Sequence, residues 1–585
     1  MLPPDARTIL TDALRPPPET ILDHAVGTTF TLDLASALIV PLAFAAREMR
    51  ESVDPITVME SVRASADRLD VFCQAGNIST PGRQSDLLAF LEPMIHPVHR
   101  PRPGRLFHPK VWLLRYRGAD NPVRLVVLSR NLTADRSWDV CLRLDGTIGT
   151  RPRAANRPLA DLVRALPGLC VHPLPSDRAE RLEQLAADVR YAEWELPNDV
   201  ADVRFHALGI PGGRVPDFHG NRHLVVAPFC NEAGLALTAP ASVGRVTLVG
   251  RQEQLDRLPE RVVAGCTALV VNELAGVPSG DDRQGEILTG LHAKAFVIEK
   301  GHRARLLVGS ANATDAAFRG NVELLVELEG SKWKLGIDTL VGDDAEFRSI
   351  LEPYQRQPVE DDDAAGNRLE EVLRDLAAVP MTVTVEARES MWSTRLATNT
   401  AVNWSPEHVR RVTAELVTRP GEARDLAAGQ RIDAGFGGLE VVDITPFVVL
   451  RAEGQDGRDC RTVVRARLVG DPAGRLDEVL ARQIDSPEKF LRLVALLLGL
   501  ATDGSAQGVL SGQDGGDWGE WTGPGLFELL IRSLVDRPAA LADLTRLVAR
   551  LRSTERGRAA LPPGFDELWD AVSVVERELA AEVPA

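Results

Sequence analysis

Two tripeptides in this chain carry side chains that can act together in chemistry: His108-Pro109-Lys110 and His292-Ala293-Lys294. An imidazole can serve as a nucleophile or exchange protons near neutral pH, and an ammonium group binds anionic oxygens. The 585 residues include 67 arginines and lysines, yet only six of these are lysines. Chance predicts roughly 0.1 His-x-Lys pairs at this composition, so two pairs are a signal. A lysine kept in an arginine-rich chain indicates that a compact ammonium charge is needed there.

A Ser-x-Asn triplet follows each pair: Ser129-Arg130-Asn131 and Ser310-Ala311-Asn312. The intervening residues predict two hairpins, because apolar runs flank a turn that contains glycine. The first hairpin has strands at 110–117 and 123–128, and the second has strands at 294–298 and 305–308. Alternate residues of a strand share a face, so His and Lys of each pair lie together, and Ser and Asn return to the same end.

This double pattern resembles the phospholipase D superfamily, whose signature is His-x-Lys, an acidic residue five positions later, and Gly-Ser-x-Asn. The second copy fits, with Glu299 at the acidic position and Gly309 before the serine. The first copy departs, because Arg115 and Leu128 stand at those two positions. The acidic residue is mainly structural in the family, so its absence affects the predicted chemistry little. The resemblance covers roughly residues 25–345 and extends to the nuclease-like branch often found in bacterial defence systems.

The resemblance implies one active site in which both motifs meet across a pseudo-twofold axis. It implies a phosphohistidine intermediate and no metal or other cofactor. By analogy His108 is the nucleophile and His292 the acid and base, although the sequence leaves the reverse order open. Lysines and asparagines stabilise phosphate charge, and the serines either bind near the phosphate or brace the histidines. The predicted catalytic set is His108, Lys110, Ser129, Asn131, His292, Lys294, Ser310 and Asn312.

Three acidic residues form a predicted second layer around this set. Asp139 and Glu323 follow the first and second motif, at the acidic position that often follows the motif in nuclease-like relatives. Each either orients an imidazole or is a solvated strand end. Glu299 completes the layer as the acidic residue of the signature itself.

Charge is distributed unevenly along the chain. The net charge is −16, but the segment 100–153 has 12 basic and 4 acidic residues. A local basic patch beside a phosphate-handling site is suited to a polyanion. Arginines on sheet edges that are merely solvated are the alternative. The predicted nucleic-acid-binding residues are Arg102, Arg105, Arg124 and Arg130.

The predicted fold class is α/β, with two phospholipase D-like lobes in a pseudo-twofold pair followed by a C-terminal α+β module. Strands are expected at 28–38, 69–73, 223–229, 243–250 and 268–272, and helices at 155–194. The C-terminal part has predicted strands at 382–386, 439–444, 447–452 and 461–469, and helices at 488–500 and 526–552. The domains are a first lobe at 1–150, a helical bridge at 151–205, a second lobe at 206–350, an acidic linker at 351–371 and a recognition or partner-docking module at 372–585.

The remaining composition excludes several protein classes. Six cysteines without paired spacing indicate neither a disulfide framework nor a zinc knuckle. No signal peptide is evident, and the apolar runs at 34–46 and 490–501 are too short to span a bilayer. The sequence therefore predicts a cytoplasmic protein without a membrane partner.

The resemblance and the basic segment together predict a metal-independent phosphodiesterase or nuclease that acts on nucleic acid, DNA rather than RNA. Its family context is bacterial anti-phage defence or restriction, with a helicase or ATPase as partner protein. Two alternatives stay open: a phospholipid-processing phospholipase D or phosphatidyltransferase, and a protein that binds nucleic acid or a partner without catalysis. The oligomeric state is either a monomer or a homodimer.

Overall fold

The structure is a computed structural model. It describes residues 10–48, 62–80, 86–118, 120–134, 137–240, 242–272, 290–359, 364–388, 391–476, 478–479 and 569–570. The chain divides into two compact units, which are taken separately below. The first unit comprises Met1–Leu32, Val71–Asn77 and His96–Asn367, and the second comprises Asp33–Asp70, Ile78–Ile95 and Arg368–Ala585.

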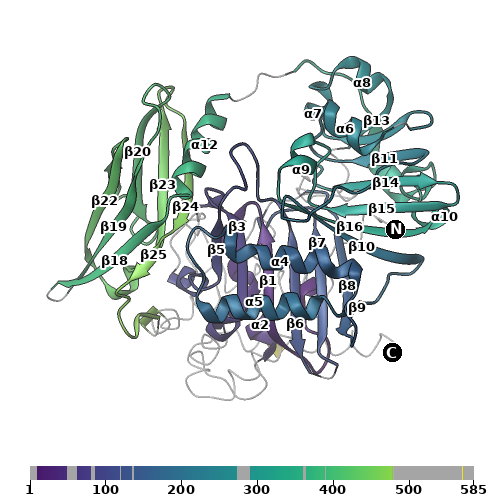
Figure 1. The fold of residues 1–585 in the computed structure, drawn as a ribbon. Helices are drawn as coiled ribbons and strands as arrows, with labels where there is room; N and C mark the ends of the chain where they lie inside the picture. Colours follow the sequence, from purple (N-terminus) through teal and green to yellow (C-terminus); the bar gives the residue numbers. More distant parts are fainter. Residues whose placement is uncertain are drawn as a thin grey trace. The chain divides into compact units, whose positions relative to one another are not determined.

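The first unit contains a seven-stranded sheet in the order β5-β3-β1-β6-β7-β8-β9. Two helices, α4 (Arg157–Leu169) and α5 (Ser176–Val189), lie across one face of it (Figure 1). Both fall within the predicted helical stretch 155–194. Pro158 stands in the first turn of α4, where a missing backbone N–H is tolerated. The strands are β1 (Ile21–Thr29), β3 (Leu69–Gln74), β5 (Ile95–Val98), β6 (Val111–Arg117), β7 (Pro122–Leu128), β8 (Cys141–Ile148) and β9 (Ala192–Trp194).

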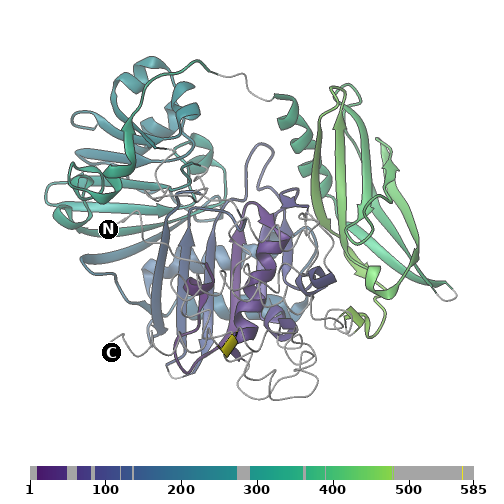
Figure 2. The same cartoon turned by 180° about the vertical axis from the view of Figure 1, so that it is seen from behind.

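The same unit contains an eight-stranded sheet in the order β10-β16-β15-β14-β11-β12-β13-β17. Strands β11, β12 and β13 are parallel to one another, and the other pairs are antiparallel. The class is therefore mixed α/β, as predicted. Figures 1 and 2 show both sheets from opposite sides. The strands are β10 (Val200–Leu208), β11 (Arg222–Val226), β12 (Val246–Gly250), β13 (Cys266–Val271), β14 (Ala295–Lys300), β15 (Arg303–Gly309), β16 (Glu323–Ser331) and β17 (Leu351–Pro353).

Alternation along β16 shows how the eight-stranded sheet is packed. Leu324, Val326 and Leu328 enter a large apolar cluster that also contains side chains of α4 and α5. Leu325 points to the other face and joins Phe296 in a second apolar cluster, under the short helices α6 (Glu232–Thr238) and α9 (Asp315–Arg319). A period of two with both faces buried is typical of a central strand.

Both predicted hairpins are confirmed, as β6–β7 and β14–β15. The motif tripeptides themselves lie just before β6 and β14 and not inside the strands. Phe107 and Leu291 pair with other segments of the chain, while the carbonyls of Lys110 and Lys294 still accept hydrogen bonds from the partner strands of the hairpins.

Two strand predictions are wrong. Residues 28–38 contain the end of β1 and the start of helix α2 (Leu34–Glu48), because the Asp33 carboxylate accepts hydrogen bonds from the backbone of Ala35 and Ser36. A capping carboxylate begins a helix where the apolar run alone favours a strand. Residues 439–444 hold a 3₁₀ turn, η4 (Val441–Asp443), which is closed by a capping box from Glu440.

The second unit holds two four-stranded sheets, ordered β22-β19-β18-β25 and β21-β20-β23-β24. Helix α12 (Ala364–Ala377) lies beside them in Figure 1. The predicted helices 488–500 and 526–552 lie outside the described residues. The strands are β18 (Met381–Arg388), β19 (Met391–Val402), β20 (Val409–Leu416), β21 (Arg424–Leu426), β22 (Gln430–Leu439), β23 (Phe447–Gly454), β24 (Asp459–Arg465) and β25 (Arg467–Val469).

Segments 33–70 and 78–95, which the sequence assigns to the first lobe, group with this second unit. Their polar contacts show why. The Thr462 hydroxyl donates to the carbonyl of Ile78 at 3.1 Å, and the buried Arg475 guanidinium forms two hydrogen bonds with the Glu92 carboxylate. A bidentate pair of this kind fixes geometry as well as charge.

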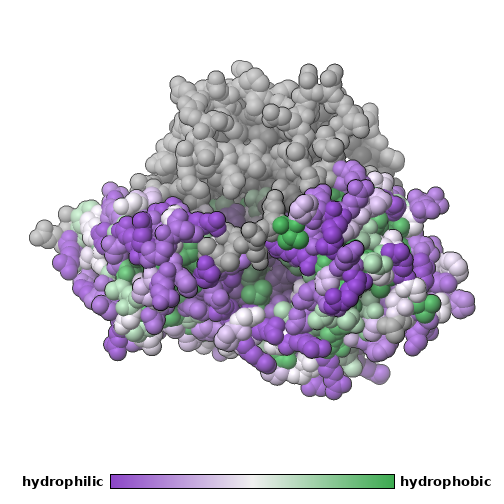
Figure 3. Space-filling view, turned by 90° about the horizontal axis from the view of Figure 1, so that it is seen from above, coloured by the Kyte–Doolittle hydropathy of each residue, from purple (hydrophilic) through white to green (hydrophobic). Residues whose placement is uncertain are grey.

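Hydrophilic side chains (purple) dominate the described surface seen in Figure 3, and hydrophobic ones (green) are dispersed in small groups. Among the described helices, none combines the length and the apolar character that crossing a bilayer requires.

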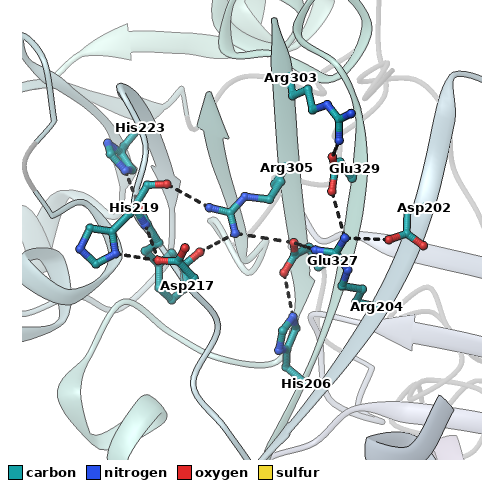
Figure 4. A network of polar contacts seen from close by, with 11 residues as sticks. Asp202, Arg204, His206, Asp217, His219, His223, Arg303, Arg305, Glu327 and Glu329 are labelled. Atoms are coloured by element: carbon teal, nitrogen blue, oxygen red, sulfur yellow. Dashed lines mark hydrogen bonds and ion pairs between the residues drawn. The ribbon is translucent and has the colours of Figure 1, made fainter. Parts of the chain in front are cut away.

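A polar network lies on β16 farther along the strand from Glu323 (Figure 4). Glu327, which is buried, accepts from His206 at 2.8 Å and pairs with Arg204 and Arg305. Burial raises the pKa of Glu327, but its hydrogen bond to His206 and the nearby arginines hold the pKa below its usual range. No residue of this network belongs to the two motifs. Glu327 is thus a buried carboxylate on β16 that lies outside the motif cluster.

Candidate active site

The imidazole of His108 is oriented by a carboxylate from the other sheet. His108 Nδ1 lies 3.0 Å from Oε2 of Glu323, the first residue of β16. Both side chains are buried, and Glu323 has no exposed surface. Glu323 also accepts hydrogen bonds from the hydroxyl of Ser310 and from Nδ2 of Asn321. The acidic residue that follows the second motif therefore binds the histidine of the first.

A backbone hydrogen bond joins each motif to the residue directly before the acidic residue that follows the other motif. His108 N–H donates to the carbonyl of Val322 at 2.9 Å, and His292 N–H donates to the carbonyl of Trp138 at 2.6 Å. The first motif thus bonds to the residue before Glu323, and the second motif bonds to the residue before Asp139. The corresponding backbone bridges are Phe107–Val322 and Leu291–Trp138.

The two motif lysines are buried close to each other. Lys110 Nζ donates to the carbonyl of His108 at 3.1 Å. Lys294 Nζ donates to its own motif's His292 carbonyl at 2.8 Å and to the carbonyl of Ser129 at 3.1 Å. Lys294 therefore contacts both motifs. Two buried ammonium groups repel one another and create a site that favours an anion.

Burial and neighbouring charges set the ionisation of this cluster. Burial lowers the pKa of His108 to about 4, against the opposing effect of Glu323. Burial and then the charge of Lys294 lower the pKa of Lys110 well below its usual value. Burial raises the pKa of Glu323, but His108, Lys110 and Ser310 outweigh it and hold the pKa below the usual range. At neutral pH a neutral imidazole therefore donates Nδ1–H to an ionised carboxylate.

The motif serines brace the backbone of the following strand. Ser129 Oγ accepts from Val140 N at 2.7 Å, and Ser310 Oγ accepts from Leu324 N at 3.1 Å. Ser310 also donates to Glu323, the hydrogen-bond partner of His108. Ser310 can therefore brace His108 through Glu323, whereas the Ser129 hydroxyl contacts the backbone of Val140.

The motif asparagines carry the same unusual feature in both copies. Asn131 Oδ1 and Asn312 Oδ1 are buried and lack a hydrogen-bond partner among the described residues. Buried polar atoms are nearly always paired, so each orphaned atom needs an explanation. Rotation of either amide would present an N–H donor in its place, which an anion can accept.

Asp139 directly precedes Val140, which pairs with the motif serine Ser129. Glu323 has the same position after the second motif, directly before Leu324, which pairs with Ser310. The Asp139 carboxylate lies 4.0 Å from Nε of Arg130. Asp139 therefore has the same position along the chain as Glu323, and its carboxylate lies near Arg130 of its own motif.

Glu299 lies five residues beyond Lys294, at the far part of β14, and is not part of the cluster around His108. Its carboxylate accepts from Ile337 N at 2.8 Å and from Arg222 at 3.1 Å. It holds α11 (Ile337–Val341) and β11 against β14. These contacts match the mainly structural role expected for the acidic position of the signature, and they do not place Glu299 in a layer around the histidines.

Arg115 explains why the first motif lacks that acid. Its guanidinium donates to Asp23 on β1 at 2.6 Å and to Asp188 on α5 at 2.6 Å. Glu299 on β14 pairs with an arginine of β11, while Arg115 on β6 pairs with an aspartate of β1. Both hairpins therefore have an ion pair to the neighbouring strand at this position, with the acidic and the basic residue exchanged between the two strands.

The four predicted binding arginines differ in exposure. Arg102 is exposed, and Arg105 is half-buried with its side chain against Gly320. Arg130 is half-buried and donates to the carbonyl of Thr133 at 2.7 Å. Arg124 is only 2% exposed, pairs with Asp145 and donates to two backbone carbonyls. The prediction that Arg124 contacts nucleic acid is therefore wrong, because its charge already has partners in the interior.

One residue beside the reacting groups escaped the sequence patterns. The ring of Phe30 lies 5.3 Å from the ring of His108, and Lys110 Nζ is 5.9 Å from its centroid. Phe30 follows β1 in a bend and carries no motif, so only the tertiary pairing of β1 with β6 reveals it.

In the part of the chain that the structure describes, no group of three or more His, Cys, Asp or Glu side chains is placed to hold a metal ion.

Comparison with known proteins adds fold similarities. No family model and no curated protein matches the sequence. A mutant of yeast tyrosyl-DNA phosphodiesterase resembles the structure with a TM-score of 0.36 and 11% identity, over 54% of this chain and 85% of that one. Polyphosphate kinase from Porphyromonas gingivalis gives 0.29 and 12%, over 54% and 41%. Both are phospholipase D superfamily members.

Proposed function

We propose that this chain is a phosphodiesterase that cleaves nucleic acid through a phosphohistidine intermediate without a metal ion. The two sheets of the first unit are, in this proposal, a pseudo-twofold pair of phospholipase D-like lobes. The observation that carries it is the hydrogen bond between His108 and Glu323, which joins the two motifs into one cluster. The exchanged backbone bridges support the pseudo-twofold relation.

In the first step, the lone pair on His108 Nε2 attacks phosphorus. Nδ1 keeps its proton and donates a hydrogen bond to Glu323, which holds the ring in the reactive tautomer and stabilises the positive charge that develops. The lowered pKa of His108 keeps this lone pair available at neutral pH. The bond from phosphorus to the leaving oxygen breaks, and protonated His292 gives that oxygen its proton.

In the second step, His292 acts in the opposite direction. As a neutral base it takes a proton from water, whose oxygen attacks the phosphorus of the intermediate. The P–N bond breaks and its electron pair returns to His108 Nε2. The products are an alcohol and a phosphate monoester, and His292 is again protonated.

The lysines and asparagines supply charge stabilisation for both steps. Lys110 and Lys294 place two buried amino groups near the transferring group, and an anionic phosphate there favours their protonated forms. A phosphate there relieves their mutual repulsion, so binding is favoured by the same groups that stabilise the transition state. The unpartnered amides of Asn131 and Asn312 gain a partner in the same event.

The basic surface residues Arg102 and Arg105 favour a polyanionic substrate over an isolated phosphate ester. DNA is the proposed substrate class. The proposal keeps the C-terminal region, 372–585, as a recognition or partner-docking module. Bacterial defence with a helicase or ATPase is the setting that the motif resemblance suggests.

The test is incubation of purified protein with single- and double-stranded DNA and RNA in excess EDTA, with His108→Ala as control. Cleavage by the wild type alone supports the proposal. Loss of cleavage in EDTA, restored by a divalent ion, overturns the mechanism. Hydrolysis of anionic phospholipid vesicles without cleavage of any oligonucleotide would assign the site to lipids.

A further inference from the structure

One aromatic ring in the eight-stranded sheet's unit is left open to solvent beside the second motif. Phe229 is 40% exposed, whereas Phe296 and Phe318 of the same half are 0% and 4% exposed. Packing explains the buried rings, but it does not explain an exposed one. Because single exposed apolar residues are common, its position decides whether it has a role.

The sheet topology places Phe229 at the edge that carries the motif. It follows β11 and Arg251 follows β12, and these strands are parallel, so both residues leave the sheet at the same edge. Strand β14 is antiparallel to β11 and begins at that edge, directly after Lys294. In sheets of this kind, ligands bind at the carboxyl ends of the parallel strands.

Backbone contacts connect both residues to the motif. The carbonyl of Phe229 accepts from Ala313 N at 3.1 Å, one residue beyond Asn312. Arg251 Nε donates to the carbonyl of Leu291 at 2.8 Å, one residue before His292. The Phe229 backbone and the Arg251 side chain are therefore each hydrogen-bonded to a residue adjacent to the second motif.

The two side chains also contact each other. The guanidinium carbon of Arg251 lies 5.3 Å from the ring centroid of Phe229. The cation supports the ring through a cation–π contact, and a supported ring loses little conformational entropy when a flat ligand stacks on it.

We propose that Phe229 and Arg251 form a nucleobase-binding subsite, in which an unpaired base next to the cleaved phosphate stacks on Phe229. This inference rests on the proposed function and adds to it that the substrate presents an unpaired nucleotide on the side of the second motif. Every base has a π-face, so the subsite selects strandedness and not sequence. A base held in a closed duplex is already stacked and cannot occupy it.

The experiment is a cycle between protein and substrate. Single-stranded oligonucleotides, intact or with one abasic position beside the cleaved phosphate, are cleaved by wild type, Phe229→Ala and Phe229→Trp. Phe229→Ala should lower kcat/KM on the intact strand by roughly tenfold. It should have no further effect on the abasic strand that lacks the stacked base, and Phe229→Trp should retain wild-type behaviour.

Trp333→Ala is the matched control. Trp333 is 70% exposed and has Lys332 Nζ 4.6 Å from its ring, but it follows the opposite end of β16. Its removal should change none of these rates.

Equal losses for Phe229→Ala on intact and abasic strands at every position would overturn the subsite and leave the proposed function standing. If the wild type cleaves no oligonucleotide, the proposed function fails separately. Fluorescence anisotropy with the same strands then decides on the subsite. Unchanged binding in Phe229→Ala rejects it, and weaker binding to the intact strand alone supports it.

Discussion

His108 Nδ1 and Glu323 Oε2 lie 3.0 Å apart although 215 residues separate them in the chain. This pair fixes the tautomer and the ring orientation of the proposed nucleophile. Glu323→Gln keeps the size of the side chain but removes the charge that stabilises the imidazolium-like state. We expect kcat to fall by roughly 10²-fold or more, with the substrate KM little changed.

Glu327→Gln is the control for that variant. Glu327 lies on the same strand and the same face, is equally enclosed, and binds His206 in place of His108 (Figure 4). Its kcat should stay near the wild-type value. Similar losses of kcat in both variants would mean that a buried carboxylate on β16 is needed for folding and that Glu323 has no specific effect on His108.

The pH dependence of kcat/KM should reveal the ionisation of His108. Its pKa of about 4 keeps the imidazole neutral through the range where an ordinary histidine is protonated. Activity should therefore persist as the pH falls past 6.5, and decline only as His108 gains a proton near pH 4. Stopped assays from pH 3.5 to 8, with circular dichroism to verify folding, provide the measurement. An acidic limb at pH 6.5 would contradict the assignment.

A trapping experiment distinguishes the two histidines. His292→Asn removes the group that activates water, so the covalent adduct on His108 should accumulate. The adduct is acid-labile and alkali-stable, and mass spectrometry of a digest kept at high pH locates it. His108→Asn should give no adduct. A phosphoryl group found on His292 would reverse the roles of the two motifs.

Surface and buried arginines should respond differently to charge reversal. Arg102→Glu and Arg105→Glu should weaken oligonucleotide binding and reduce the slope of log affinity against log salt by about one each. Arg124→Glu should lower the free energy of unfolding by about 3–5 kcal/mol instead, because it breaks a buried ion pair. Salt titrations and thermal melts of the three variants separate these effects. A melting temperature unchanged by Arg124→Glu would show that Arg124 is accessible.

The exchanged ion pairs predict a purely structural role for the signature's acidic position. Glu299→Gln and Arg115→Met should each lower the free energy of unfolding by about 1–3 kcal/mol. Activity below the melting temperature should be kept, since neither side chain contacts the motif residues. Denaturant titration measures the free energy of unfolding, and the rate of oligonucleotide cleavage measures the activity.

Local patterns in the sequence predicted the elements that carry the motifs. The two hairpins follow from apolar alternation around a turn, which acts within a few residues. The spacing of His, Lys, Ser and Asn placed them near one end of each hairpin. The pairing of Glu323 with His108 depends on how the two sheets meet, so no local pattern specifies it.

The missed features share the same cause. Phe30 reaches His108 only because β1 pairs with β6, and Arg124 is buried only because Asp145 and the carbonyl groups of Ala13 and Arg15 surround it. Strands β19 and β20 were not predicted, because the polar residues Thr394, Thr398 and Thr413 stand at buried positions where the alternation would require apolar ones. Sheet partners, and not propensity, stabilise such strands.

The hydrogen bond that His108 donates to Glu323 can form only after β16 has been made. Translation produces the first motif well before β16, so the nascent chain carries His108 for a period without its carboxylate partner. The second histidine is likewise absent until the chain has passed residue 292. The cluster that joins the two motifs is therefore incomplete on the nascent chain until β16 has been made.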